Sequence, residues 1–259
     1  MPSRSYPPGT TSVVAALRAA GCVFAEDEAA LLMAATDDAA ELDALVARRV
    51  AGEPLEHLLG WAEFCGLRIA VAPGVFVPRR RTEALAEEAV LRTRPGAVVV
   101  DLCCGSGAVG AAVAAAVAGI ELHAADVDPA AVACARRNLP AAAVHQGDLF
   151  AALPPGLRGR VDVLVANAPY VPTSAIGLMP PEARDHEPAV ALDGGDDGLA
   201  VLRRIVTGAP AWLAPGGALL FETGTAQIAD AVAAVRSAGL GPLVVEDDER
   251  GATVVVGTR

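Results

Sequence analysis

From Thr82 to the C-terminus, short apolar runs alternate with helical patterns, and this rhythm constrains the fold most. Strands are expected at residues 97–102, 121–125, 142–146, 161–166 and 218–222, and helices at 82–92, 108–118, 129–138, 198–213 and 227–238. This order predicts an α/β fold, a parallel sheet with helices on both faces. Two further strands, 242–246 and 252–257, flank a polar turn. They predict a final hairpin, so that one edge of the sheet is antiparallel.

Before Thr82 the pattern changes. Helical periodicity covers residues 11–21, 26–36 and 40–51, with Gly21 and Gly52 as stop signals. Residues 63–71 and 75–77 then flank Ala72-Pro73-Gly74, which predicts a β-hairpin that turns at these three residues. We therefore expect three parts: an N-terminal helical domain (1–60), a linker hairpin (61–81) and an α/β domain (82–259).

Charge restricts the partners of this chain. Its 31 acidic and 20 basic residues give a net charge of −11, and every basic residue is Arg. Nucleic acid is an unfavourable partner because binding a polyphosphate backbone needs a basic face. A local exception is Arg79-Arg80-Arg81, which is typical of a solvated loop.

Several features favour a cytoplasmic protein. Residues 1–10 lack the apolar stretch of a secretion signal. The five cysteines show neither metal-ligand nor redox spacing, which fits reduced thiols and predicts no metal site. Residues 102–120 carry no charge, but Gly105, Ser106 and Gly107 interrupt them, so a strand, loop and helix fit better than a membrane span. We expect a monomer without a membrane segment.

A glycine-rich loop follows the expected strand 97–102. Gly105, Gly107 and Gly110 fit the dinucleotide fingerprint G-x-G-x-x-G, and Asp126 ends the next strand, where a ribose-binding carboxylate is expected. The motif admits two cofactors. A nicotinamide dinucleotide would place its pyrophosphate at the helix N-terminus, whereas S-adenosylmethionine carries cationic groups and needs an acid nearby.

Acids at three successive strand ends favour S-adenosylmethionine. Asp101 precedes the glycines, Asp126 ends the second strand, and Asp148 follows the third, beside the apolar Leu149. Ligands of such sheets bind at the carboxyl ends of the strands. The expected cofactor-binding residues are Asp101, Cys103, Gly105, Gly107, Asp126, Val127, Asp148, Leu149 and Asn167.

Asn167-Ala168-Pro169-Tyr170 follows the apolar run 161–166 and is the candidate catalytic segment. It supplies oxygen acceptors, a rigid bend and an aromatic face, which suit transfer of a group onto a planar NH2 nitrogen. An ordinary turn has the same composition. An exocyclic amine of adenine or cytosine is an alternative acceptor, which would be flipped out of its stack.

Motifs in the same order as in a known family run through nearly the whole chain. They include Gly52-Glu53-Pro54-Leu55, Val77-Pro78-Arg79, Asp101 to Gly107, the catalytic segment and Arg184-Asp185-His186-Glu187-Pro188. The chain resembles the protein N5-glutamine methyltransferases, the HemK/PrmC family. The resemblance implies a Rossmann-like class I methyltransferase with a seven-stranded sheet and S-adenosylmethionine as cofactor. It also implies catalysis by Asn167 to Tyr170.

The resemblance further implies a protein substrate, a release factor with its Gly-Gly-Gln loop or a ribosomal protein, held by the N-terminal helical unit. The chain departs from the family twice. Ala168 stands where the family has Pro, and Arg79-Arg80-Arg81 replaces an Arg-Pro pair. We expect the chemistry to be retained with a looser turn, because Pro169 still restricts Ala168. Two other functions stay open: a nicotinamide-linked oxidoreductase, and a degenerate member that binds its partner without catalysis.

Overall fold

The computed structural model describes residues 10–259. The absence of a secretion signal was predicted from residues 1–10, and all but the last of these lie outside the described residues. Within residues 10–259, no helix is long and apolar enough to cross a membrane.

Four helices at the start of the described chain pack around an apolar core of their own. They are α1 (Thr10–Ala19), α2 (Ala25–Ala35), α3 (Ala39–Val50) and α4 (Leu55–Leu59). Leu17 and Leu32 are fully buried, and Leu45 and Leu58 pack against them. The first three helices match the predicted periodic segments. The prediction missed α4, because five residues are too few to show a helical period.

A two-stranded hairpin follows, but the predicted position of its turn was wrong. Strand β1 (Trp61–Phe64) pairs antiparallel with β2 (Leu67–Ala70), so the chain reverses at Cys65 and Gly66. Both residues have positive φ, 49° and 72°, as two-residue hairpin loops require. Residues 75–77, predicted as the second strand, form no strand in the structure.

The main sheet has seven strands in the order β5-β4-β3-β6-β7-β9-β8. Their bounds are β3 (Val98–Leu102), β4 (Glu121–Asp126), β5 (Ala143–Gln146), β6 (Val161–Ala166), β7 (Leu213–Glu222), β8 (Gly241–Asp247) and β9 (Ala252–Thr258). Strands β3 to β7 are parallel, and β9 pairs antiparallel with both β7 and β8. The α/β fold and the antiparallel hairpin at one edge are therefore confirmed; β9, one strand in from that edge, runs against the others.

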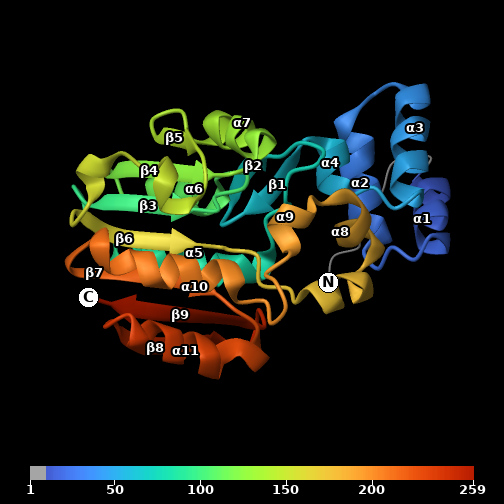
Figure 1. Cartoon of the computed structure of the whole chain (residues 1–259). Helices are drawn as coiled ribbons and strands as arrows, with labels where there is room; N and C mark the ends of the chain where they lie inside the picture. Colours follow the sequence, from blue (N-terminus) through green and yellow to red (C-terminus); the bar gives the residue numbers. More distant parts are fainter. Residues whose placement is uncertain (1–9) are drawn as a thin grey trace.

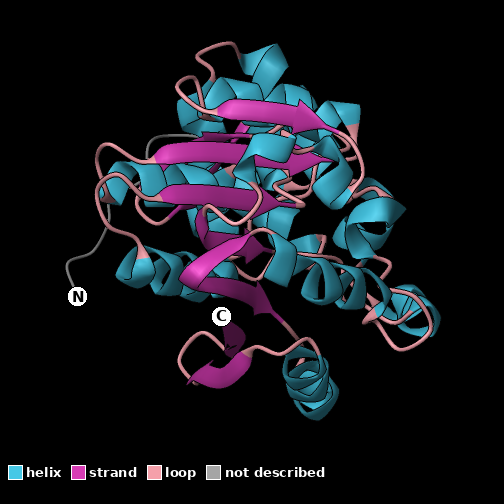
Figure 2. Ribbon diagram, turned by 60° about the vertical axis from the view of Figure 1, so that its left-hand side comes forward, coloured by secondary structure: helices cyan, strands magenta, loops and turns pink. Residues whose placement is uncertain are grey.

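Helices cover both faces of the twisted sheet (Figure 2). On one face α5 (Glu83–Arg92), α6 (Ala108–Ala116) and α7 (Pro129–Asn138) contribute to a core with Val99 and Val163. On the other, α10 (Ala200–Gly208) and α11 (Ile228–Ser237) pack with Val98, Val100 and Leu164. Alternate residues of β3 thus enter opposite cores, as the period of two requires.

The carboxyl ends of the parallel strands face the part of the molecule that holds helices α1–α4 (Figure 1). Between them lies the segment after β6, which contains the 3-10 helix η4 (Thr173–Leu178), α8 (Pro181–His186) and α9 (Ala189–Leu192). These short helices were not predicted. Three prolines, Pro180, Pro181 and Pro188, mark their starts, and proline suits the first turn of a helix.

Arg49 of α3 joins the N-terminal helices to this segment. Its guanidinium donates to Glu28 Oε2 of α2 at 2.6 Å and to Glu182 Oε1 of α8 at 2.5 Å, and its side chain is only 7% exposed. A buried charge needs such partners, and removing one side of the pair leaves the other uncompensated.

We predict that Arg49→Ala lowers the free energy of unfolding by about 3 kcal/mol, because two carboxylates lose their partner. The measurement is urea denaturation followed by circular dichroism. The neighbouring Arg48 pairs with Glu53 at the surface and is the matched control. Arg48→Ala should cost less than about 1 kcal/mol. Equal losses in the two variants would contradict the prediction.

Candidate active site

Four strand ends place a row of side chains along one edge of the sheet. Leu102, Ala125, Ala166 and Phe221 are neighbours across the sheet in the pairings of β3 with β4, β3 with β6 and β6 with β7. The next residue of each strand or loop is Cys103, Asp126, Asn167 and Glu222 respectively. A predicted acid and the start of the catalytic segment therefore reach the same edge, as the strand-end rule requires.

A cavity of about 340 Å³ opens at this edge. Every residue predicted for the cofactor or the reaction, except Gly107, contributes to its lining. The cofactor residues other than Asn167 lie toward the ends of β3, β4 and β5, and the catalytic segment, which includes Asn167, lies at the end of β6. Apolar side chains also line the cavity: Phe76, Met179, Val190 and Leu192.

Asp101 lies at the bottom of the glycine loop and is 1% exposed. Its Oδ2 accepts the Gly110 N–H at 2.9 Å, which ties the end of β3 to the first turns of α6. Burial raises the pKa of Asp101 to about 7; the Gly110 hydrogen bond opposes the rise, and the nearby Asp126 adds to it. Asp101 is thus a buried acid whose ionised form gains from a cation placed close to it.

Asp126 organises the other side of the loop. It accepts the Gly105 N–H and the Asp128 N–H, both at 2.9 Å, and burial raises its pKa. Gly105 has a φ of 53°, and a Cβ built there meets no atom within 4 Å. Because Gly105 lines the cavity, its missing side chain leaves room for a ligand. Gly107 serves packing instead: a Cβ there would lie 2.9 Å from Leu139 Cδ1.

The remaining cofactor candidates form the rim. Cys103 and Leu149 line the cavity with positive φ, 55° and 49°, which is a strained conformation often found at functional sites. Val127 is 49% exposed. Asp148 is also at the rim, but its Oδ2 lies 2.6 Å from Arg204 Nη2, so its charge is already paired. Its contact with the cofactor stays a prediction.

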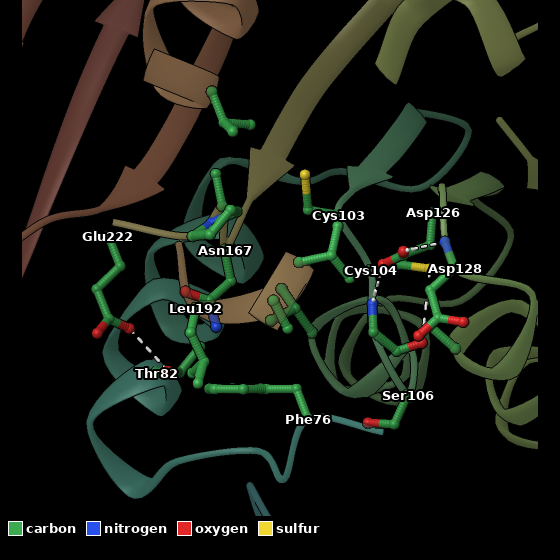
Figure 3. Close-up of a pocket in the computed structure, with 18 of the residues that line it drawn as sticks. Phe76, Thr82, Cys103, Cys104, Ser106, Asp126, Asp128, Asn167, Leu192 and Glu222 are labelled. Carbon is green, nitrogen blue, oxygen red and sulfur yellow. Dashed lines mark hydrogen bonds between the residues drawn. The ribbon is translucent and has the colours of Figure 1, made fainter. Parts of the chain in front are cut away.

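In the catalytic segment, the side chain of Asn167 is half-buried, lines the cavity and forms no hydrogen bond with any residue in 10–259. Figure 3 shows it between Cys103 and Glu222. Ala168 and Pro169 are buried, and no backbone N–H of the described chain bonds to the Ala168 carbonyl. Tyr170 donates its hydroxyl to Glu222 Oε1 at 2.6 Å. The segment thus offers two unused oxygen acceptors beside a fixed aromatic ring.

The solvated-loop interpretation of Arg79-Arg80-Arg81 was incomplete: Arg80 and Arg81 are exposed, but Arg81, like the half-buried Arg79, is bound to a carboxylate. Arg79 donates to both oxygens of buried Glu187 at 2.7 Å, and Arg81 donates to buried Glu222 at 2.8 Å. These two arginines are bound because two buried carboxylates lie beside the linker, which the linear sequence does not show.

The sequence that forms this cavity matches known methyltransferases. Residues 66–179 match the family "Methyltransferase small domain". A release factor glutamine methyltransferase of Geobacter sulfurreducens is 39% identical over 219 residues, which cover 83% of this chain and 76% of that protein. The chain belongs to the HemK/PrmC family of glutamine methyltransferases. The resemblance inferred from the motifs is therefore confirmed.

Two further matches are a relative with a different substrate and a solved structure with a similar fold. A 4-amino-L-phenylalanine/4-methylamino-L-phenylalanine methyltransferase of Streptomyces pristinaespiralis is 40% identical over 205 residues, 75% of this chain and 69% of that protein. The crystal structure of a methyltransferase from Pyrococcus furiosus superposes with a TM-score of 0.56 at 18% identity, covering 82% of this chain and 96% of that one. This structural likeness concerns the fold alone.

The sequence analysis of this family member missed Glu222 as a site residue. It ends the predicted strand 218–222, lines the cavity and is 3% exposed. The strand-end rule that selected Asp126 and Asn167 applies equally to Glu222. Among residues 10–259, no group of three or more His, Cys, Asp or Glu has a metal-binding arrangement.

Proposed function

We propose that this chain transfers a methyl group from S-adenosylmethionine to the side-chain amide nitrogen of a glutamine, in a peptide chain release factor. The observation that carries the proposal is Asn167. Its unbonded amide group lies in the same cavity as the acid-lined glycine loop and Tyr170. Family membership supports the same reaction.

The glycine loop fits S-adenosylmethionine. The open space above Gly105 receives a ligand without a clash, and the buried Asp101 and the half-buried Asp126 supply negative charge. The buried carboxyl of Asp101 does not suit a pyrophosphate, which argues against the nicotinamide alternative. Asp126 does not separate the two cofactors, because a ribose-binding carboxylate is expected there for a dinucleotide as well. When bound, the cofactor supplies an electrophilic methyl group on a sulfonium. Asp101, Gly105 and Asp126 would hold it, with Cys103, Val127 and Leu149 at the rim.

The protein promotes methyl transfer by positioning the amide nitrogen of the substrate glutamine. An amide nitrogen is a poor nucleophile because its lone pair is delocalised into the carbonyl. The Asn167 Oδ1 and the Ala168 carbonyl accept the two N–H groups of the substrate amide, which fixes the nitrogen in one direction. Such placement makes a bimolecular step effectively unimolecular. Tyr170 stacks on the planar amide, a contact worth about 1 kcal/mol.

The apolar lining of the cavity restricts which substrate groups can enter it. Phe76, Met179, Val190 and Leu192 are apolar residues of the cavity lining. We expect these apolar side chains to admit the side chain of a glutamine while its backbone stays outside. Helices α1–α4 lie on the side toward which the strand ends point (Figure 1). We propose that this N-terminal unit, residues 1–60, holds the protein substrate, and that the enzyme acts as a monomer in the cytoplasm.

The deciding experiment is incubation with methyl-labelled S-adenosylmethionine and a release factor, followed by mass mapping of the modified residue. The expected product carries one methyl on the glutamine of the Gly-Gly-Gln loop. A release factor with Ala in place of that glutamine is the matched control and should stay unlabelled. A ribosomal protein, 4-amino-L-phenylalanine and single-stranded DNA or RNA form parallel reactions. Labelling of one of these, and not of the release factor, would overturn the proposed substrate.

The departure at Ala168 gives a further prediction. Proline would fix φ at this position and restrict Asn167, and no hydrogen bond of the Ala168 N–H is lost within the described chain. Ala168→Pro should therefore raise the turnover number by about two- to fivefold if the turn is loose, since a fixed turn lowers the entropic cost of placement. The affinity for the cofactor should not change. An unchanged turnover number would show that other contacts already fix the turn.

A further inference from the structure

Glu222 is a buried acid at the end of the row that holds Asn167. It follows Phe221, which pairs across the sheet with Ala166, so Glu222 and Asn167 leave neighbouring strands at the same level. The Glu222 side chain is only 2% exposed. Burying a carboxylate is costly unless it is paired and hydrogen-bonded, so its partners show what the position is used for.

Three donors bind the Glu222 carboxylate, and they come from two different parts of the chain. Tyr170 of the catalytic segment donates its hydroxyl to Oε1 at 2.6 Å. Arg81 donates Nε to the same oxygen at 2.8 Å, and Thr82 donates its hydroxyl to Oε2 at 2.7 Å. Figure 3 shows the bond to Thr82 across the cavity from Asp126. The carboxylate therefore links the catalytic segment to the end of the linker.

The loop between β7, which ends at Glu222, and α11 also binds the backbone of Tyr170. Gln227 donates Nε2 to the Tyr170 carbonyl and to the Asp197 carbonyl, both at 2.9 Å. Its Oε1 accepts the Gly224 N–H at 3.0 Å, which fixes the Gln227 amide itself. Tyr170 is thus bound at its carbonyl by Gln227 and at its hydroxyl by Glu222, so both ends of the residue are held.

Arg81 completes the arrangement. Its Cζ lies 5.8 Å from the centre of the Tyr170 ring, and the ring is mostly buried. Burial and the neighbouring Glu222 raise the pKa of Tyr170, so the phenol stays protonated and remains a donor. The ring keeps one orientation as long as the carboxylate is present, because its hydroxyl has a charged acceptor there.

We propose that Glu222 is a positioning residue of the methyl transfer: by accepting the Tyr170 hydroxyl, it fixes the ring on which the acceptor group stacks. The inference rests on the proposed function, in which Tyr170 contacts the substrate amide. Arg81 and Thr82 hold the carboxylate in turn, so the orientation of the ring depends on the linker. The purely structural alternative is that Glu222 only compensates Arg81 and stabilises the fold.

A double-mutant cycle separates the two roles. Tyr170→Phe removes only the hydroxyl. Glu222→Gln keeps the size of the side chain but replaces the charged acceptor of that hydroxyl by a neutral amide oxygen, whose hydrogen bond is weaker. If Glu222 acts through Tyr170, each variant lowers kcat by about tenfold and the double variant is no worse than the poorer single one. The KM for S-adenosylmethionine should stay within twofold. Independent, multiplying losses in kcat would overturn the proposal.

Glu187 is the matched control, because it is also buried and also bound by an arginine, Arg79, but does not line the cavity. The loss of kcat caused by Glu187→Gln should multiply with that of Tyr170→Phe. If Glu222→Gln does not fold, Arg81→Gln replaces it in the cycle. Its effect should also be absorbed by Tyr170→Phe, and a multiplying effect would overturn the proposal.

A spectroscopic readout tests positioning without a substrate. The chain has two tyrosines, Tyr6 and Tyr170. In protein with 13C-labelled tyrosine rings, Tyr170→Phe therefore identifies the Tyr170 signals. Glu222→Gln should shift and broaden these signals, and Glu187→Gln should not. A shift without methylation of any tested substrate would leave the positioning role standing and defeat the proposed function. Unchanged Tyr170 signals in Glu222→Gln would defeat the positioning role.

Discussion

Asn167→Ala should abolish methyl transfer while the protein still binds its cofactor. The substrate amide loses its side-chain acceptor, so the nitrogen is no longer held in line with the donor. Removing one such preorganised hydrogen-bonding group typically costs about 100- to 1,000-fold in kcat. Asn167 makes no hydrogen bond inside the described protein, so the change should leave the fold intact. The measurement is single-turnover transfer of labelled methyl to the release factor.

Two comparisons make this prediction specific. Asn167→Asp keeps the oxygen acceptors and should retain more activity than Asn167→Ala. Asn167 is also one of the residues expected to contact the cofactor, but the acids of the glycine loop lie on other strands and remain in both variants. Cofactor affinity, measured by isothermal titration calorimetry, should therefore change less than about threefold in either variant. Asn167 would not be the hydrogen-bond acceptor for the substrate amide if Asn167→Ala retained methyl transfer, or if it lost cofactor binding to the same degree as methyl transfer.

The sequence was sufficient where the signal is periodic and local. Strand β6 and helix α7 have the predicted bounds, because an apolar run before a turn and a helix capped by Asp128 are complete within a few residues. The order of the strands was enough to predict that Asp126 and Asn167 lie at one edge, since parallel strands of a sheet end on the same side.

The sequence was insufficient where contacts come from distant segments. Ala72-Pro73-Gly74 has better turn composition than Cys65-Gly66, yet the hairpin turns at the latter, where Glu83 Oε1, 18 residues away, accepts the Cys65 N–H at 2.8 Å. Likewise, nothing local shows that Arg81 binds Glu222, which is 141 residues away. Asp148 looked like a free acid, and its partner Arg204 lies on a helix 56 residues further on.

The second large effect concerns Asp101 and pH. Burial raises the pKa of this carboxyl to about 7 in the folded protein, against an ordinary value of 3.8. The folded protein then holds a proton on Asp101 between about pH 4 and pH 7, where the unfolded chain does not. The stabilisation from this group is present at low pH and is lost as the pH rises through about 7.

A cationic ligand reverses that preference. The ionised form of Asp101 attracts the cationic groups of S-adenosylmethionine, so binding should favour the deprotonated carboxyl. We predict that affinity increases as the pH rises from 5.5 to about 7, by up to about tenfold per pH unit, and then levels off. Calorimetric titrations across this range measure the slope, and thermal shifts should show stabilisation by the cofactor growing with pH.

Asp101→Asn is the decisive variant, because its amide oxygen still accepts the Gly110 N–H while the charge is gone. Compared with the native protein, the variant should bind S-adenosylmethionine about 10- to 100-fold more weakly at pH 8, where the native carboxylate is ionised. At pH 5.5 the difference in affinity should be small. Asp126 also has a raised pKa, so Asp126→Asn serves as the matched control and should weaken binding while keeping the slope below pH 7. If Asp101 causes the increase of cofactor affinity with pH, Asp101→Asn removes that increase. An equal increase in both variants would show that a titrating group of the cofactor causes it.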